Sequence, residues 1–154
     1  MRRLLAIVLT LGLIAAVPVL AQQTAQHVLS TPDTLKWAEP PTLPGARLAV
    51  VHGNPGQEGP FVYRVRMPAN YKIAPHFHKA AENVTVLAGT FYVGMGEKFD
   101  QGSGKELPVG GFASIPATHP HFAWAGNQET VVQVHGTGPT DITFVNPADD
   151  PRKK

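Results

Sequence analysis

Four of the seven histidines form two pairs with the same spacing, and a pair of this kind can bind a metal ion. The pairs are His76/His78 and His119/His121. On a strand, residues i and i+2 project from the same face, whereas on a helix they point about 200° apart. Pro75 and the apolar residues before it favour a strand, so we expect His76 and His78 to project together.

A carboxylate follows the first pair after three residues, at Glu82. Imidazole and carboxylate groups are ordinary ligands for Fe, Mn, Ni, Cu and Zn, so one divalent transition metal of unspecified identity is the expected cofactor. A further histidine from a later strand would complete a four-ligand set. The pair alone also fits two histidines on a solvated strand. Carbonic anhydrases and barrel hydrolases also place such pairs on strands, but their folds need longer chains than 154 residues.

The elements that position these residues are expected to be short strands. The chain has 15 glycines and 15 prolines among 154 residues, of which 43% are hydrophobic, and this composition is typical of strands joined by turns. We therefore predict an all-β sandwich or barrel of about nine strands. A polar stretch at 96–108 is expected to form a loop or one helical turn. The expected strands are 47–52, 61–67, 71–78, 83–87, 90–95, 112–115, 121–125, 130–135 and 141–145.

The beginning of the chain has the pattern of a secretory signal peptide. Arg2 and Arg3 precede an apolar stretch shorter than the roughly 20 residues that span a bilayer, and Ala21 suits the cleavage site. We expect residues 1–21 to be removed, which leaves no stable membrane anchor and a periplasmic or secreted protein. The alternative to general secretion is twin-arginine export of an already folded, metal-loaded chain.

Three further segments follow the signal peptide. Residues 22–46 are rich in Gln, Thr and Pro and are expected to form an extended arm, with Trp37 docked on the barrel or on a second subunit of a possible homodimer. The barrel itself is predicted at 47–146. Residues 147–154 are charged and contain proline, so a flexible, solvated tail is expected.

Charge and cysteine content exclude several classes of function. Without residues 1–21, basic and acidic side chains balance at 11 each, so nothing supports binding to a nucleic-acid backbone. The chain has no cysteine, which excludes disulfides, cysteine nucleophiles and cysteine metal sites. A metal must therefore be held by nitrogen and oxygen atoms.

Two segments resemble the conserved motifs of the cupin superfamily. The first cupin motif is G-x5-H-x-H-x3,4-E-x6-G, and Asn70–Gly89 is NYKIAPHFHKAAENVTVLAG, with asparagine at the opening glycine. The second is G-x5-P-x-G-x2-H-x3-N, and GGFASIPATHPH begins at Gly110. Within this motif Thr118 replaces the second glycine, and Ala125, four residues after His121, replaces the final asparagine. The resemblance covers roughly residues 47–146. The separation between Gly89 and Gly110 is similar to that in small single-domain bacterial cupins.

The resemblance implies a jelly-roll β-barrel with a metal ion inside. Carried over position by position, the motifs assign His76, His78, Glu82 and His121 as metal ligands. They also assign Gly89 to the turn between the two strands of the first motif. The replacements in the second motif put the shape of its turns in doubt but leave the ligands in place.

The remaining polar candidates depend on which strand faces line the barrel. His119 could lie beside the metal if strand parity continued through Pro120, although the motif expects only the later histidine. If the face of 130–135 that carries Gln133 and His135 lines the cavity, both would contact the substrate or the ligands; otherwise they lie at the barrel rim. Tyr92 is a further pocket candidate. The two remaining histidines, His27 and His52, are expected at the surface.

Two classes of function fit these residues. The chain has no serine triad pattern and no phosphate loop, so any chemistry is expected to be that of the metal, with a small-molecule substrate. The first hypothesis is a metal-dependent enzyme, best an Fe- or Mn-type dioxygenase, otherwise a lyase, decarboxylase or isomerase. Glu82 and His135 are then the candidate catalytic groups. The second hypothesis is a non-catalytic periplasmic module that binds a small ligand or a metal.

Overall fold

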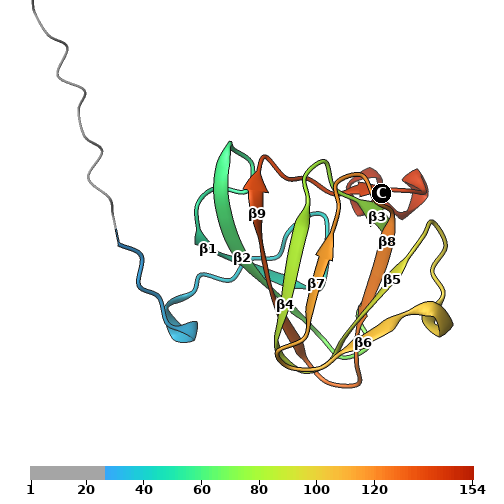
Figure 1. Cartoon of the computed structure of the whole chain (residues 1–154), viewed down its shortest axis with the longest axis horizontal. Coiled ribbons are helices and arrows are strands. Elements are labelled where there is room, and N and C mark those ends of the chain that lie inside the picture. Colours follow the sequence, from blue (N-terminus) through green and yellow to red (C-terminus); the bar gives the residue numbers. More distant parts are fainter. Residues whose placement is uncertain (1–26) are drawn as a thin grey trace, which may run out of the picture.

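The computed structural model describes residues 27–154, which form two antiparallel five-stranded sheets. The expected signal peptide, residues 1–21, lies outside this range. The first sheet has the strand order β1-β2-β9-β4-β7, and the second has the order β10-β3-β8-β5-β6. Figure 1 shows the two sheets facing each other as the walls of a barrel. The predicted all-β class is therefore confirmed.

The strand boundaries follow the breakers in the sequence. The first sheet consists of β1 (Arg47–His52), β2 (Gly59–Met67), β4 (Glu82–Ala88), β7 (Phe112–Ile115) and β9 (Thr130–Gly138). The second consists of β3 (Lys72–Phe77), β5 (Phe91–Met95), β6 (Lys105–Leu107), β8 (His121–Ala125) and β10 (Thr143–Phe144). The sequence pattern did not predict β6, because its three residues lack an apolar alternation. The 3₁₀ turn η2 (Gln101–Ser103) accounts for the helical turn expected in that stretch.

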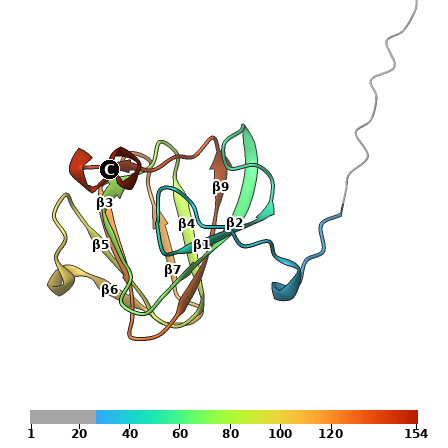
Figure 2. The same ribbon diagram turned by 180° about the vertical axis from the view of Figure 1, so that it is seen from behind.

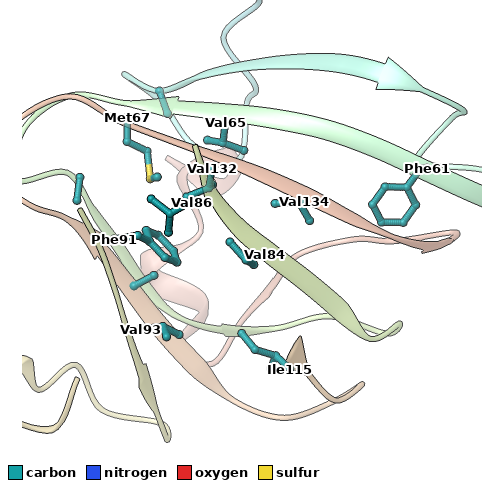
Figure 3. Close-up of a cluster of buried hydrophobic side chains, with 13 residues drawn as sticks. Phe61, Val65, Met67, Val84, Val86, Phe91, Val93, Ile115, Val132 and Val134 are labelled. Carbon is teal, nitrogen blue, oxygen red and sulfur yellow. The ribbon is translucent and has the colours of Figure 1, made fainter. Parts of the chain in front are cut away.

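Alternation of apolar and polar residues decides which face of each strand points inward. On β2, Phe61, Val65 and Met67 are buried, while Arg66 projects outward. Figure 3 shows these side chains packed with others from both sheets, including Val86 of β4 and residues of β5, β7 and β9. These buried side chains join the two sheets and form the inner wall of the barrel.

A left-handed glycine permits the tight turn between β4 and β5. Gly89 has φ +73°, and a Cβ atom there would lie 2.5 Å from the carbonyl oxygen of Glu129. The backbone approaches that closely only because glycine has no side chain. This is the turn that the cupin resemblance implied.

The segment before the barrel pairs with it through backbone and aromatic contacts. Ala38 forms an isolated bridge with Leu48 of β1, and the guanidinium of Arg66 lies 4.4 Å from the centre of the Trp37 ring. Trp37 thus docks on its own barrel through a cation–π contact. Farther toward the N-terminus, the chain leads away from the barrel in both ribbon views, past the 3₁₀ turn η1 (Pro32–Thr34) (Figures 1 and 2).

The C-terminal residues differ from the flexible tail expected at 147–154. They form the 3₁₀ turns η3 (Pro147–Asp149) and η4 (Pro151–Lys153), which lie beside the end of β3 in both ribbon views (Figures 1 and 2). Asp150 is buried and accepts hydrogen bonds from Arg152. Pro147 and Pro151 each begin one of the two turns, and the charged residues Asp150 and Arg152 pair with each other. These residues had suggested a solvated tail.

Within 27–154, no helix is long and apolar enough to cross a membrane.

Candidate metal centre

Three buried histidines converge between the sheets. His76 lies near the end of β3, His78 follows that strand directly, and His121 opens β8 opposite His76 in the β3–β8 register. The ring centroids of His76 and His121 are 4.2 Å apart, and that of His78 lies 5.0 Å and 5.4 Å from them. One nitrogen of each ring lies within 4.8 Å of the others, which suits a shared metal ion.

Backbone carbonyl groups fix the orientation of all three rings. The Nδ1 of His76 lies 2.8 Å from the carbonyl oxygen of Ala74, and that of His121 lies 3.0 Å from that of His119. The Nδ1 of His78 contacts the carbonyl oxygen of Asp141. A carbonyl oxygen can only accept, so each Nδ1 carries a proton, and Nε2 is the ring nitrogen left to bind a metal ion. Metal-binding histidines are commonly held in this way.

The carboxylate of Glu82 joins the three rings from the first residue of β4. Its Oε2 lies 3.5 Å from the Nε2 of His78 and 3.5 Å from the Nε2 of His121. Burial acts to raise the pKa of Glu82, but the contact with His121 and the neighbouring imidazoles outweigh it and lower the pKa. The carboxylate therefore stays ionised among the rings.

The imidazole of His76 is neutral at physiological pH. Burial lowers its pKa from 6.5 to about 3, and the adjacent rings of His121 and His78 add to the effect. Neutral imidazole is the form that binds a metal, since protonation would occupy the donor lone pair.

The donor atoms fit a divalent transition metal. The Nε2 of His78 is buried and has no hydrogen-bond partner among residues 27–154, although a buried polar atom normally has one. Three imidazoles and one carboxylate form a nitrogen–oxygen set suited to Fe, Mn, Ni, Cu or Zn. A metal at their centre would supply the missing partner and compensate the buried carboxylate.

The histidines lie at the wall of a largely apolar cavity inside the barrel. Its volume is about 390 Å³, within the usual range for small-molecule sites. The polar groups of the metal centre occupy one part of the wall, and most of the rest is aliphatic. The apolar lining includes Leu43, Leu48, Val65, Met67, Ile73, Val84, Phe91, Val93, Ile115, Val132 and Val134.

Comparison with known proteins identifies the family. The model of the ChrR cupin-like domain matches residues 25–141. The chain belongs to this cupin family. The expected cupin membership and jelly-roll barrel are thereby confirmed. Among curated proteins, no sequence matches this cupin significantly.

Solved structures share the fold of this cupin at low sequence identity. The polyketide cyclase RemF from Streptomyces resistomycificus has a TM-score of 0.67 at 20% identity, over 83% of this chain and 92% of its own. A putative acetylacetone dioxygenase from Methylibium petroleiphilum has a TM-score of 0.61 at 18% identity, over 84% and 88%. Rhodobacter sphaeroides SigE in complex with the anti-sigma ChrR gives 0.52 at 15% identity, over 70% and 51%.

The sequence analysis did not single out five polar residues that line the cavity of this cupin: Thr42, Tyr63, Thr140, Asp141 and Arg152. Tyr63 lies on the inward face of β2; burial and then the charge of Glu82 raise the pKa of its hydroxyl well above the usual value. Arg152, from the C-terminal turn η4, also lines the cavity. Tyr63 alternates with Phe61 and Val65 on one face of β2, whereas nothing local in the sequence places Arg152 at the cavity.

His119 contributes its backbone and not its imidazole. Its side chain is exposed, while its carbonyl oxygen faces the Nδ1 of His121. Strand parity does not extend to it, because β8 begins only at His121 and the preceding turn contains Thr118 at φ +60°.

The expected pocket positions of Gln133, His135 and Tyr92 are wrong for the barrel cavity. On β9 the inward residues are Val132 and Val134, so Gln133 and His135 lie on the outer face. There the Oε1 of Gln133 accepts a hydrogen bond from the Nε of Arg64, 3.1 Å away.

Tyr92 also points outward, between the inward residues Phe91 and Val93 of β5. Its hydroxyl donates to Glu106 at 3.0 Å, and its ring stacks on Trp124. Because His135 also lies on the outer face, it is no candidate for a group that acts on a substrate in the cavity. The two remaining histidines, His27 and His52, are exposed as expected.

Proposed function

We propose that this cupin is an exported metal-dependent enzyme that acts on a small, largely apolar organic molecule. An Fe- or Mn-type dioxygenase is the first choice, followed by a lyase or an isomerase. The observation that carries the proposal is the position of three histidines and one carboxylate on the wall of an apolar cavity of about 390 Å³. Such a cavity buries the apolar part of a substrate and directs its polar atoms to the metal centre.

Each polar group of the site has a distinct part in this proposal. His76, His78, His121 and Glu82 would hold the ion, which when bound supplies Lewis-acid or redox chemistry. The ionised Glu82 is also the carboxylate placed to accept a proton from a substrate. The protonated hydroxyl of Tyr63 is placed to donate a hydrogen bond to a substrate oxygen.

Metal content and turnover test the proposal together. Natively exported protein, purified from the organism that produces it, would be analysed for Fe, Mn, Ni, Cu and Zn. Oxygen consumption and product formation would then be followed with catechols, flavonols, diketones and carboxylic acids. We expect roughly one ion per chain and turnover of at least one compound class. A fully metallated protein that turns over none of them would contradict the enzymatic part of the proposal.

Substitution of Tyr63 tests its role in substrate binding. Tyr63→Phe removes one hydroxyl from the cavity, so we expect about fivefold weaker binding of an active compound, the loss of one ordinary hydrogen bond. Tyr92→Phe is the matched control, because that hydroxyl lies outside the barrel and should not affect binding. Equal effects of the two substitutions would exclude a substrate contact by Tyr63.

A non-catalytic binding module is the second candidate. The family model that matches is that of the ChrR cupin-like domain, and the structure of SigE in complex with the anti-sigma ChrR has a similar fold. Because ChrR is bound to a partner in that structure, a binding role is the alternative to catalysis. Thermal shifts with compounds of the panel, without turnover by the metallated protein, would favour this alternative.

Export and dimer formation belong to the proposal as well. Export depends on Arg2, Arg3 and the apolar stretch up to Ala21, and cell fractionation with N-terminal sequencing tests it. A homodimer would be seen by sedimentation of the exported protein. Recovery of uncleaved protein from the cytoplasm would contradict export.

A further inference from the structure

One of the three site histidines is oriented by a distant part of the chain. The carbonyl groups that fix His76 and His121 come from residues two positions earlier in the sequence. The carbonyl that fixes His78 belongs to Asp141, which lies 63 positions later. The geometry of His78 therefore depends on how the segment around Asp141 is held.

Side-chain contacts on both sides of Asp141 hold this segment in place. The Oδ1 of Asp141 accepts a hydrogen bond from the backbone N–H of Lys79 at 3.1 Å, and its Oδ2 lies 3.1 Å from the Nζ of the same lysine. The next carbonyl group, that of Ile142, accepts a hydrogen bond from the Nη2 of Arg152 at 3.2 Å. The segment is thus tied to the residue after His78 and to the C-terminal turn.

The guanidinium of Arg152 is itself fixed by a carboxylate two residues earlier. Its Nε lies 2.8 Å from the Oδ1 of Asp150, and its Nη2 lies 2.8 Å from the Oδ2. Asp150 is buried and also caps the turn by accepting from the backbone N–H of Arg152. A bidentate pair of this kind has a strict geometry, which a lysine cannot reproduce.

We propose that Arg152 is a positioning residue for the metal centre. Together with Asp150 it holds the segment 141–142 so that the Asp141 carbonyl keeps His78 in the tautomer and orientation that present Nε2 to the centre. Both ribbon views place the C-terminal turns beside the end of β3, where His78 lies (Figures 1 and 2). The metal part of this inference rests on the proposed function.

The alternative part for Arg152 is to bind an anionic substrate, since it lines the cavity. The contacts favour positioning, because Asp150 already engages two of its nitrogens and compensates its charge, and the Ile142 carbonyl adds a third bond. Because the Asp150 carboxylate already compensates the charge of the guanidinium, its attraction for a second anion is weakened.

Nitrogen-15 NMR of the imidazole rings in the metal-free protein tests the inference directly. In Arg152→Ala we expect the Nδ1–H signal of His78 to shift or to exchange rapidly with water, while those of His76 and His121 stay unchanged. Arg152→Lys should have the same effect in weaker form. Lys153→Ala, an exposed neighbour in the same turn, is the matched control.

Zinc affinity is the second measurement, made by competition with a chromophoric chelator. We expect roughly tenfold weaker binding in Arg152→Ala, the lower end of the effect of losing a group that supports a ligand. If Arg152→Ala does not fold, Arg152→Lys takes its place in both measurements.

Two NMR results in Arg152→Ala would overturn the inference: no change of the His78 signal, or equal changes of all three histidine signals. A variant that binds carboxylic acids more weakly, but keeps its His78 signal and its zinc affinity, would also overturn it. A wild-type protein that binds no zinc would contradict the proposed function. The NMR prediction for the His78 ring would still stand or fail on its own.

Discussion

The two histidine-bearing motifs have the same spacing between their histidines, yet the first contributes both rings to the centre and the second only one. In the first, β3 continues to Phe77 and both His76 and His78 are buried. In the second, β8 starts at His121, so His119 belongs to the preceding turn and is exposed. The rule that i and i+2 share a face therefore holds only where the strand is continuous.

The turn before His121 connects the two motifs. The backbone N–H of Thr118 donates to the carbonyl oxygen of His78 at 2.7 Å. Thr118 and Asn70 occupy glycine positions of the second and first motifs, and both keep the left-handed backbone, at φ +60°. The turn thus retains the conformation for which glycine is common, despite the substitution.

The largest expected difference between the motifs is in metal binding. His121→Ala removes a donor and should lower zinc affinity by more than about 100-fold, beyond the usual effect of supporting groups. His119→Ala keeps its carbonyl and should leave affinity unchanged. Isothermal titration of both variants checks this. A large loss in His119→Ala would contradict the assignment of that ring to the surface.

Glu82→Gln tests the group that lies between the motifs. Its carboxylate is 3.5 Å from a histidine of each motif, and the substitution removes the only negative charge among the four proposed ligands. We expect zinc affinity to fall roughly 10- to 100-fold with the fold intact. The matched change Glu106→Gln, on the outer face of β6, should have no effect on affinity. Unchanged affinity in Glu82→Gln would remove this carboxylate from the ligand set.

The two left-handed positions should differ in stability when glycine is introduced. Thr118→Gly relieves the backbone strain of a β-branched residue, although the greater conformational entropy of glycine in the unfolded chain offsets part of the gain. The net result should be a rise in the free energy of unfolding of about 1 kcal/mol. Asn70→Gly should change it by a few tenths at most, because asparagine tolerates this conformation. Urea unfolding measures both. Equal effects would show that side-chain type does not govern strain here.

The smallest expected effect is a pH dependence in the first motif alone. Burial, and then Glu39, raise the pKa of Tyr71 to about 12, and its hydroxyl donates to the carbonyl oxygen of Pro44. In the unfolded chain this group ionises near pH 10, so its contribution is complete below that pH and is lost as pH rises toward 12. Thermal unfolding should show a shallower decline in this window for Tyr71→Phe. Identical declines would contradict the prediction.

The sequence predicted the strands and the convergence of the first histidine pair because both depend on local pattern. Alternation along β2 and the breakers around β1, β7 and β8 were sufficient for their placement. Alternation identifies the inward face only where apolar residues are confined to one face of the strand. On β9 both faces carry valine, so the outward position of Gln133 and His135 depends on strand pairing that a single sequence does not display.

The parts of the site that were missed depend on an ion pair and on backbone carbonyl groups, which no sequence pattern marks. Arg152 reaches the cavity through an ion pair and a bond to a carbonyl ten residues away, and neither has a periodic signature. The carbonyl groups of Ala74 and His119 are equally invisible in a sequence, since every residue has one. The motifs thus predicted which side chains converge, but not the groups that hold them in place.

The side chains that line the cavity are also those that join the two sheets. Val84, Val132 and Val134 belong to the buried cluster of Figure 3 and to the cavity wall at once. A substitution that widens the cavity for a larger molecule therefore removes contacts between the sheets, at a cost of about 1 kcal/mol for each methylene group lost. Any enlargement of this cavity is therefore limited by the thermodynamic stability of the domain.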